Sequence, residues 1–173
     1  MAVWIWWRIA WGEDRLEILF NDCKGSFRTP GSFVSVGKHP YQRIRVADLN
    51  GDGTADIIIP NLEGNNVSVL LGEGKGTFVQ PTGSPFPLDR FPNIVAMGDV
   101  DGDGSVDVVV SNPDGGHITI LAMTRNGRVA SRKHLSVREH PKGLAIRDVD
   151  GDGKGDIAVT NNSENTVTVI FGR

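Results

Sequence analysis

The sequence has a single cysteine, Cys23, so an internal disulfide framework is excluded. Its 173 residues contain no apolar run that approaches the roughly 20 residues needed to cross a bilayer, so we expect no membrane span. Lysine and arginine form no stripe and the net charge is −3, which argues against a nucleic-acid partner. What remains is a globular chain long enough to bury a core.

Aromatic residues are scarce after the first eleven positions, which hold all four tryptophans: Trp4, Trp6, Trp7 and Trp11. This apolar start lacks the features of a secretory signal peptide. No basic segment precedes it, Arg8 interrupts it, and no small-residue cleavage site follows. We therefore interpret the start as an aromatic-rich strand.

Signatures of catalysis are also missing. The sequence has no Gly-x-Ser-x-Gly elbow, phosphate-binding loop or dinucleotide fingerprint. His39 and His140 both precede proline at one repeat position, where the middle repeat has Phe91. A position that accepts phenylalanine favours packing or a turn. We expect that the chain is not an enzyme.

Glycine, by contrast, is abundant at 22 residues, and much of it falls in a segment that occurs three times. The copies span residues 46–56, 97–107 and 146–156, and their first aspartates are spaced by 51 and 49 residues. Each copy leads into a short β-branched run, a polar turn with asparagine (Asn61, Asn112 or Asn161) and a second alternating run. Short β-branched runs separated by turn residues predict β-strands.

One repeat contains four predicted strands, at 43–47, 56–60, 67–71 and 77–80, which is the size of one β-propeller blade. The repeat also extends backwards, because residues 19–27 align with 70–78 and place Trp6 over Ile57. We therefore predict an all-β chain of about 3.5 propeller-type blades, forming a partial or oligomer-completed propeller. Its units are a partial blade without the Asp-rich loop (1–38), two full blades (39–90 and 91–139) and a partial blade (140–173).

Each loop reads D-x-[DN]-G-D-G-x-x-D, with oxygen-bearing side chains at positions 1, 3, 5 and 9. Converging carboxylates repel one another, and a divalent cation removes that conflict. A donor set of oxygen atoms alone favours Ca²⁺ over Zn²⁺, and a flexible loop favours Ca²⁺ over Mg²⁺. With the carbonyl of position 7 included, the predicted ligands of about three calcium sites are Asp48, Asn50, Asp52, Thr54, Asp56, Asp99, Asp101, Asp103, Ser105, Asp107, Asp148, Asp150, Asp152, Lys154 and Asp156.

An Asp-rich loop can also belong to an EF-hand or form a plain hairpin turn. An EF-hand needs glutamate at position 12, and that position holds Ile59, Val110 and Val159, so a helix-flanked site is rejected. Asp-Gly pairs also form plain hairpin turns, although three loops with every ligand position filled disfavour that interpretation. The first loop has Asn50 in place of an aspartate, so we expect it to bind Ca²⁺ more weakly.

The segments VADLNGDGTADIIIPN, MGDVDGDGSVDVVVSN and IRDVDGDGKGDIAVTN resemble FG-GAP/VCBS repeats, the blades of integrin-α-like β-propellers. The resemblance begins near residue 5 and implies a calcium loop between the first and second strands of a blade. It also implies adhesion, carbohydrate binding or attachment to a secreted enzyme. Such propellers usually have about seven blades, twice what this chain supplies.

Three functions follow as hypotheses: a calcium-dependent structural and interaction scaffold with a protein or glycan ligand, a lectin-like module, and a non-catalytic accessory part of a secreted enzyme. The low calcium affinity typical of extracellular modules favours an extracellular or periplasmic setting, although no signal peptide is seen. Incomplete end blades expose strand edges and an apolar face. We expect self-association, or that the chain is part of a longer one.

Overall fold

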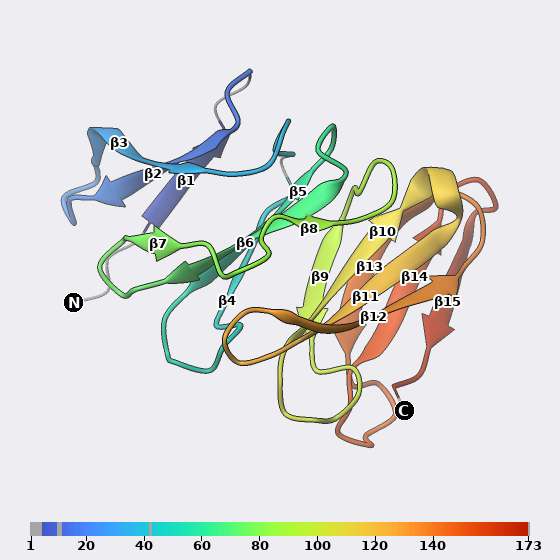
Figure 1. The fold of residues 1–173 in the computed structure, drawn as a ribbon. Coiled ribbons are helices and arrows are strands. Elements are labelled where there is room, and N and C mark those ends of the chain that lie inside the picture. Colours follow the sequence, from blue (N-terminus) through green and yellow to red (C-terminus); the bar gives the residue numbers. More distant parts are fainter. Residues whose placement is uncertain (1–4, 10–11, 42, 173) are drawn as a thin grey trace.

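The computed structural model describes residues 5–9, 12–41 and 43–172, so the expectations that fall on Trp4 and Trp11 lie outside it. The described residues form fifteen strands and one short 3₁₀ helix, η1 (Pro113–Gly115). The strands make four antiparallel sheets that succeed one another along the chain (Figure 1). The predicted all-β, blade-type fold is confirmed.

Each sheet is built from strands that are consecutive in sequence. The first contains β1 (Ile5–Ile9), β2 (Arg15–Asn21) and β3 (Phe27–Ser35). The second contains β4 (Arg45–Ala47), β5 (Asp56–Asn61), β6 (Asn66–Gly72), β7 (Phe78–Val79) and β8 (Phe86–Pro87). The third contains β9 (Val95–Gly98), β10 (Asp107–Asn112), β11 (His117–Met123) and β12 (Val129–Ser136). The fourth contains β13 (Pro141–Arg147), β14 (Asp156–Asn161) and β15 (Thr166–Ile170).

The continuous apolar runs of the repeats arise because the middle sheets are buried on both faces. Successive side chains of a strand point to opposite faces. On β5, Ile57 and Ile59 pack toward β2 of the first sheet, whereas Ile58 packs toward the third sheet. On β10, Val109 packs toward the fourth sheet. Three apolar clusters therefore fill the three spaces between neighbouring sheets.

The second sheet differs from the predicted four-strand pattern. The strand predicted at 77–80 is only Phe78–Val79, and a second short piece, Phe86–Pro87, also pairs with β6. Pro81, Pro85 and Pro87 lack the N–H group that a continuous ladder needs, so the outer edge is broken into two pieces. The first strand is also shorter than predicted, since β4 begins at Arg45.

The fourth sheet leaves apolar repeat positions uncovered on its outer face. Leu49 and Val67 of the second sheet are 2% and 0% exposed, because the third sheet covers them. Their counterparts Val149 and Val167 are 64% and 62% exposed, and Val169 is 47% exposed. The same sequence positions are thus core in one sheet and surface in the last.

No helix among the described residues is long and apolar enough to cross a membrane.

Candidate metal centres

The three Asp-rich loops occupy equivalent places, each joining the first and second strands of a motif: β4 to β5, β9 to β10, and β13 to β14. Their glycines at positions 4 and 6 all have φ between 76° and 88°, a left-handed conformation that a Cβ would penalise. Two such residues turn the chain back on itself within the loop, which brings its polar side chains near one centre.

The position-1 aspartate holds the turn closed through backbone amides. In the second loop the Gly102 amide donates to Asp99 Oδ1 at 2.7 Å, and the Gly104 amide donates to Asp99 Oδ2 at 2.9 Å. Asp48 and Asp148 accept the same pair of bonds in the other loops, at 2.7 to 3.0 Å. One network therefore recurs three times.

The side chains at positions 3 and 5 accept bonds from the loop itself. The Asp103 amide donates to Asp101 Oδ1 at 3.1 Å, and the Ser105 amide donates to Asp103 Oδ1 at 2.7 Å. In the first loop Asn50 Nδ2 also donates to Asp52 Oδ2 at 2.9 Å. Bonds from the Thr54 hydroxyl, from the Asn50 side chain and from the Thr54 amide, in that order of effect, lower the pKa of Asp52.

The position-9 aspartate is buried at the start of the second strand and accepts bonds from its own loop and from the end of the third strand or just beyond it. Asp107 is 1% exposed and accepts two bonds of 3.2 Å, from the Val100 amide in the loop and the Met123 amide at the end of β11. Asp56 and Asp156 make the equivalent pair of bonds, at 2.8 to 2.9 Å. This residue therefore joins the loop to the end of the third strand through backbone amides alone.

Burial acts differently on these three carboxyls. It raises the pKa of Asp107 to about 6 and, more weakly, raises that of Asp56, because the charged form loses hydration. In Asp156 the hydrogen bonds from the Val149 and Gly172 amides outweigh the effect of burial, so they lower the pKa of this carboxyl. The third loop belongs to the sheet with the uncovered face, so less protein surrounds its carboxylate.

The loops bring together the carboxylates of positions 1, 3 and 9. One carboxylate oxygen from each of Asp99, Asp101 and Asp107 lies within 4.8 Å of the others, and Asp148, Asp150 and Asp156 form the same group. The position-5 residues Asp103 and Asp152 do not join these groups, although they lie on the same turn. These oxygen-rich groups are the described side chains best suited to a hard cation such as Ca²⁺.

Two features of the structure had not been predicted. The asparagines expected in turns are the last residues of β5, β10 and β14 and are at most 1% exposed. They bond side chains of the next strand; Asn112 Nδ2, for example, donates to Thr119 Oγ1 at 2.9 Å. The second feature is a cluster of Asp89, His117 and His134 outside the loops. Its members are 17 to 45 positions apart, a spacing that matches no known motif.

A model of the FG-GAP-like repeat matches residues 61–110 and 99–159, more than half of the sequence. The chain belongs to the FG-GAP-like repeat family. Integrin alpha-4 of Xenopus laevis is 29% identical over 127 residues, or 67% of this chain and 11% of that protein. Cartilage acidic protein 1 of Xenopus tropicalis is 30% identical over 121 residues, or 67% of this chain and 18% of that protein. The FG-GAP chain thus spans less than a fifth of either relative.

A similar arrangement of strands occurs in the solved structure of the Photorhabdus luminescens Tc holotoxin pore. The match covers 96% of this chain and 8% of that chain, with a TM-score of 0.54 and 18% sequence identity. At this identity the similarity supports the fold of the FG-GAP repeats and carries no functional argument.

Proposed function

We propose that this chain is a calcium-binding, non-catalytic interaction scaffold whose blades are held by Ca²⁺ in the three Asp-rich loops. The observation that carries the proposal is the threefold recurrence of one loop network. In the second and third loops it gathers three carboxylates within 4.8 Å. Like charges at that separation destabilise the empty loop, and a divalent cation reverses the sign of the interaction.

Each proposed site uses the side chains of positions 1, 3, 5 and 9 and the carbonyl of position 7. Position 5 would move toward the centre when Ca²⁺ binds, since Asp103 and Asp152 lie outside the groups of close carboxylates. Loop sites in extracellular modules have affinities of about 10⁻⁴ to 10⁻³ M. Such sites fill at extracellular calcium levels, which supports an extracellular or periplasmic setting, as does the similarity to integrin alpha-4.

The interaction role is supported by the outer face of the fourth sheet. Its apolar side chains Val149, Val167, Val169 and Phe171 are 47% to 64% exposed. The second-sheet counterparts of the three valines, Leu49, Val67 and Val69, are buried against the third sheet. We propose that a further blade covers this face, and that a second copy of the chain supplies it. Two copies of about 3.5 blades would make one ring of the usual size. The chain's own ligand would then be a protein or glycan that binds the assembled surface in adhesion.

Calcium removal tests the metal part of the proposal. At 100 times the dissociation constant, each filled site adds about 2.7 kcal/mol to folding stability. We therefore expect Ca²⁺ to raise the melting temperature of the chelated chain by about 10 °C or more in differential scanning calorimetry.

A triple variant, Asp52→Asn with Asp103→Asn and Asp152→Asn, keeps the oxygen that accepts the position-7 amide in each loop but removes one charge from each. We expect this variant to lose most of the response to Ca²⁺. The control Asp114→Asn changes an acidic residue of η1 and should respond like the unmodified chain. Identical melting curves in calcium and chelator for the unmodified chain would reject the proposal.

A further inference from the structure

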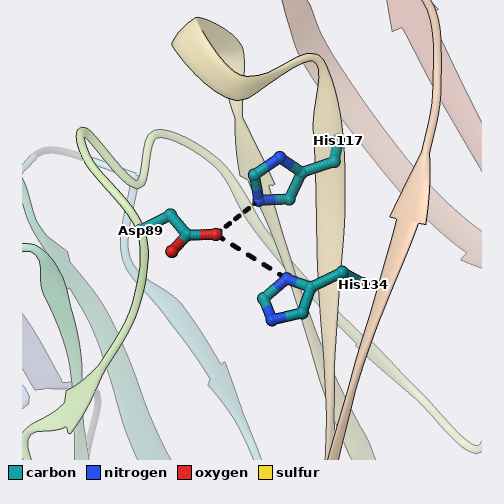
Figure 2. Close-up of side chains that lie close together, drawn as sticks. All are labelled: Asp89, His117 and His134. Carbon is teal, nitrogen blue, oxygen red and sulfur yellow. Dashed lines mark ion pairs between the residues drawn. The ribbon is translucent and has the colours of Figure 1, made fainter.

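A second group of metal-ligand side chains lies away from the loops, where the connection between β8 and β9 meets the face of the third sheet. Figure 2 shows Asp89, His117 and His134 pointing toward a common centre. Asp89 Oδ2 lies 2.8 Å from His117 Nε2 and 3.7 Å from His134 Nδ1. We propose that these three residues form a site for a divalent transition-metal ion, represented by Zn²⁺, that is independent of calcium.

The sheet positions the two imidazoles on one face. Thr119 of β11 pairs with His134 of β12, and His117 is two residues from Thr119 on the same strand. Residues that pair across strands, or lie two apart along one, share a face. The two rings accordingly meet edge to face, with centroids 5.3 Å apart.

The connection between β8 and β9 places the Asp89 carboxylate opposite the two imidazoles. The Leu88 amide donates to the Asn65 carbonyl at 2.7 Å, and the Phe91 amide donates to Asn65 Oδ1 at 3.1 Å. Asp89 is therefore held between two bonds to the hairpin of the second sheet while its side chain contacts histidines of the third. A metal at this point would join the two sheets.

The hydrogen bonds of the two rings indicate which ring nitrogens can act as ligands. His117 Nδ1 lies 3.1 Å from the Gly115 carbonyl oxygen. A carbonyl oxygen can only accept, so this bond places the ring proton on Nδ1. In the neutral ring Nε2 then carries a lone pair and can bind a cation. That buried Nε2 faces Asp89 without a hydrogen bond. Thr119 Oγ1 accepts from Asn112 and can give its own proton to His134 Nδ1 at 3.1 Å. Two acceptors that face each other, His117 Nε2 and the Asp89 carboxylate, favour a cation between them. At His134 Nδ1 a bound cation would take the place of the Thr119 proton.

The dimensions suit a small ion with nitrogen ligands. Metal–ligand distances of 2.0–2.1 Å in a tetrahedral zinc site place ligand atoms about 3.3 Å apart. The two separations from Asp89 Oδ2, 2.8 and 3.7 Å, bracket that value. Two imidazoles and one carboxylate favour Zn²⁺ over Ca²⁺. Asp89 and His134 are about half exposed, so a water molecule can complete the fourth position.

The cluster is specific to one unit of the repeat. His117 pairs with the strand-end asparagine of β10, a place held by Asn66 in the second sheet and by Thr166 in the fourth. These polar side chains bond the strand-end asparagine, whereas His117 contacts Asp89. The histidine therefore does not serve the structural role that its repeat position has elsewhere.

Zn²⁺ titration of the calcium-saturated chain, followed through the histidine ring signals in NMR, tests the site. We expect one equivalent to bind saturably and to shift the signals of His117 and His134. His134→Ala and His117→Ala each remove a direct ligand and should weaken binding by at least the roughly tenfold to hundredfold that loss of an outer-shell partner causes. Because His134 is half exposed, His134→Ala keeps the test valid if His117→Ala fails to fold.

His140→Asn is the matched control: it removes an imidazole from a position with φ of 52° that asparagine tolerates, and Zn²⁺ affinity should not change. No saturable response of the unmodified chain would overturn the proposal and leave a histidine–aspartate ion pair. Equal affinity of the unmodified chain and both alanine variants would also overturn it. Because calcium is saturating throughout, failure of this site leaves the calcium proposal untouched.

Discussion

At the scale of single residues, the aspartates of one loop have different tasks. Asp107 is buried and accepts two backbone bonds, whereas Asp103 is exposed and accepts one bond within its own turn. Asp107→Ala leaves the amides of Val100 and Met123 without a hydrogen-bond acceptor. Each buried donor left unpaired costs about 1–3 kcal/mol of unfolding free energy. We expect a total loss of about 2–6 kcal/mol in urea unfolding with chelator present. Asp103→Ala should cost less than about 1 kcal/mol there. Equal losses would contradict this division of tasks.

Asn50 offers a residue-scale test of the first loop with opposite effects in the two metal states. Asn50→Asp removes the 2.9 Å bond to Asp52 and places two carboxylates side by side. In chelator the melting temperature should therefore fall. In Ca²⁺ the added charge should tighten the first site by about 1 kcal/mol, roughly fivefold. An unchanged calcium dependence of melting would mean that this loop does not hold an ion.

At the scale of the element, the second strand of each later sheet is anchored at both ends, by the position-9 aspartate at its start and a buried asparagine at its finish. Asn161 Nδ2 donates to Thr168 at 2.9 Å and to Thr166 at 3.1 Å. We expect Asn161→Ala to cost about 1–2 kcal/mol of unfolding free energy in denaturant titration. Its exposed neighbour supplies the control, because Asn162→Ala should change stability by less than about 0.5 kcal/mol. Similar losses for both would show that the buried amide does not anchor the strand.

At the scale of the whole molecule, we expect the uncovered face of the fourth sheet to determine association. Val167→Lys with Val169→Lys places two charges on that face, so the concentration-dependent dimer expected in sedimentation should revert to monomer. Asn162→Lys adds one such charge to the exposed hairpin of the same sheet and should leave association unchanged. A monodisperse unmodified monomer at high concentration would contradict the proposed second copy.

Local sequence by itself determined the repeat, the strand positions and the loop turns of this protein. Their causes act over a few residues: β-branched runs favour strands, and Gly-x-Gly spacing permits the left-handed turns. It did not predict the broken outer edge of the second sheet, although the prolines responsible are visible in the sequence. The strand-end asparagines are polar and lie next to turn residues, so the sequence predicts turns where the structure has buried strand ends.

Only the tertiary structure decided which apolar positions are core and which side chains of distant segments meet. Val67 and Val167 occupy one repeat position, yet one is covered by a neighbouring sheet and the other is not. Asp89 reaches His117 and His134 because the connection after β8 is fastened to the preceding hairpin. Contacts of this kind depend on how sheets stack, which involves long-range packing and leaves no local pattern in the chain.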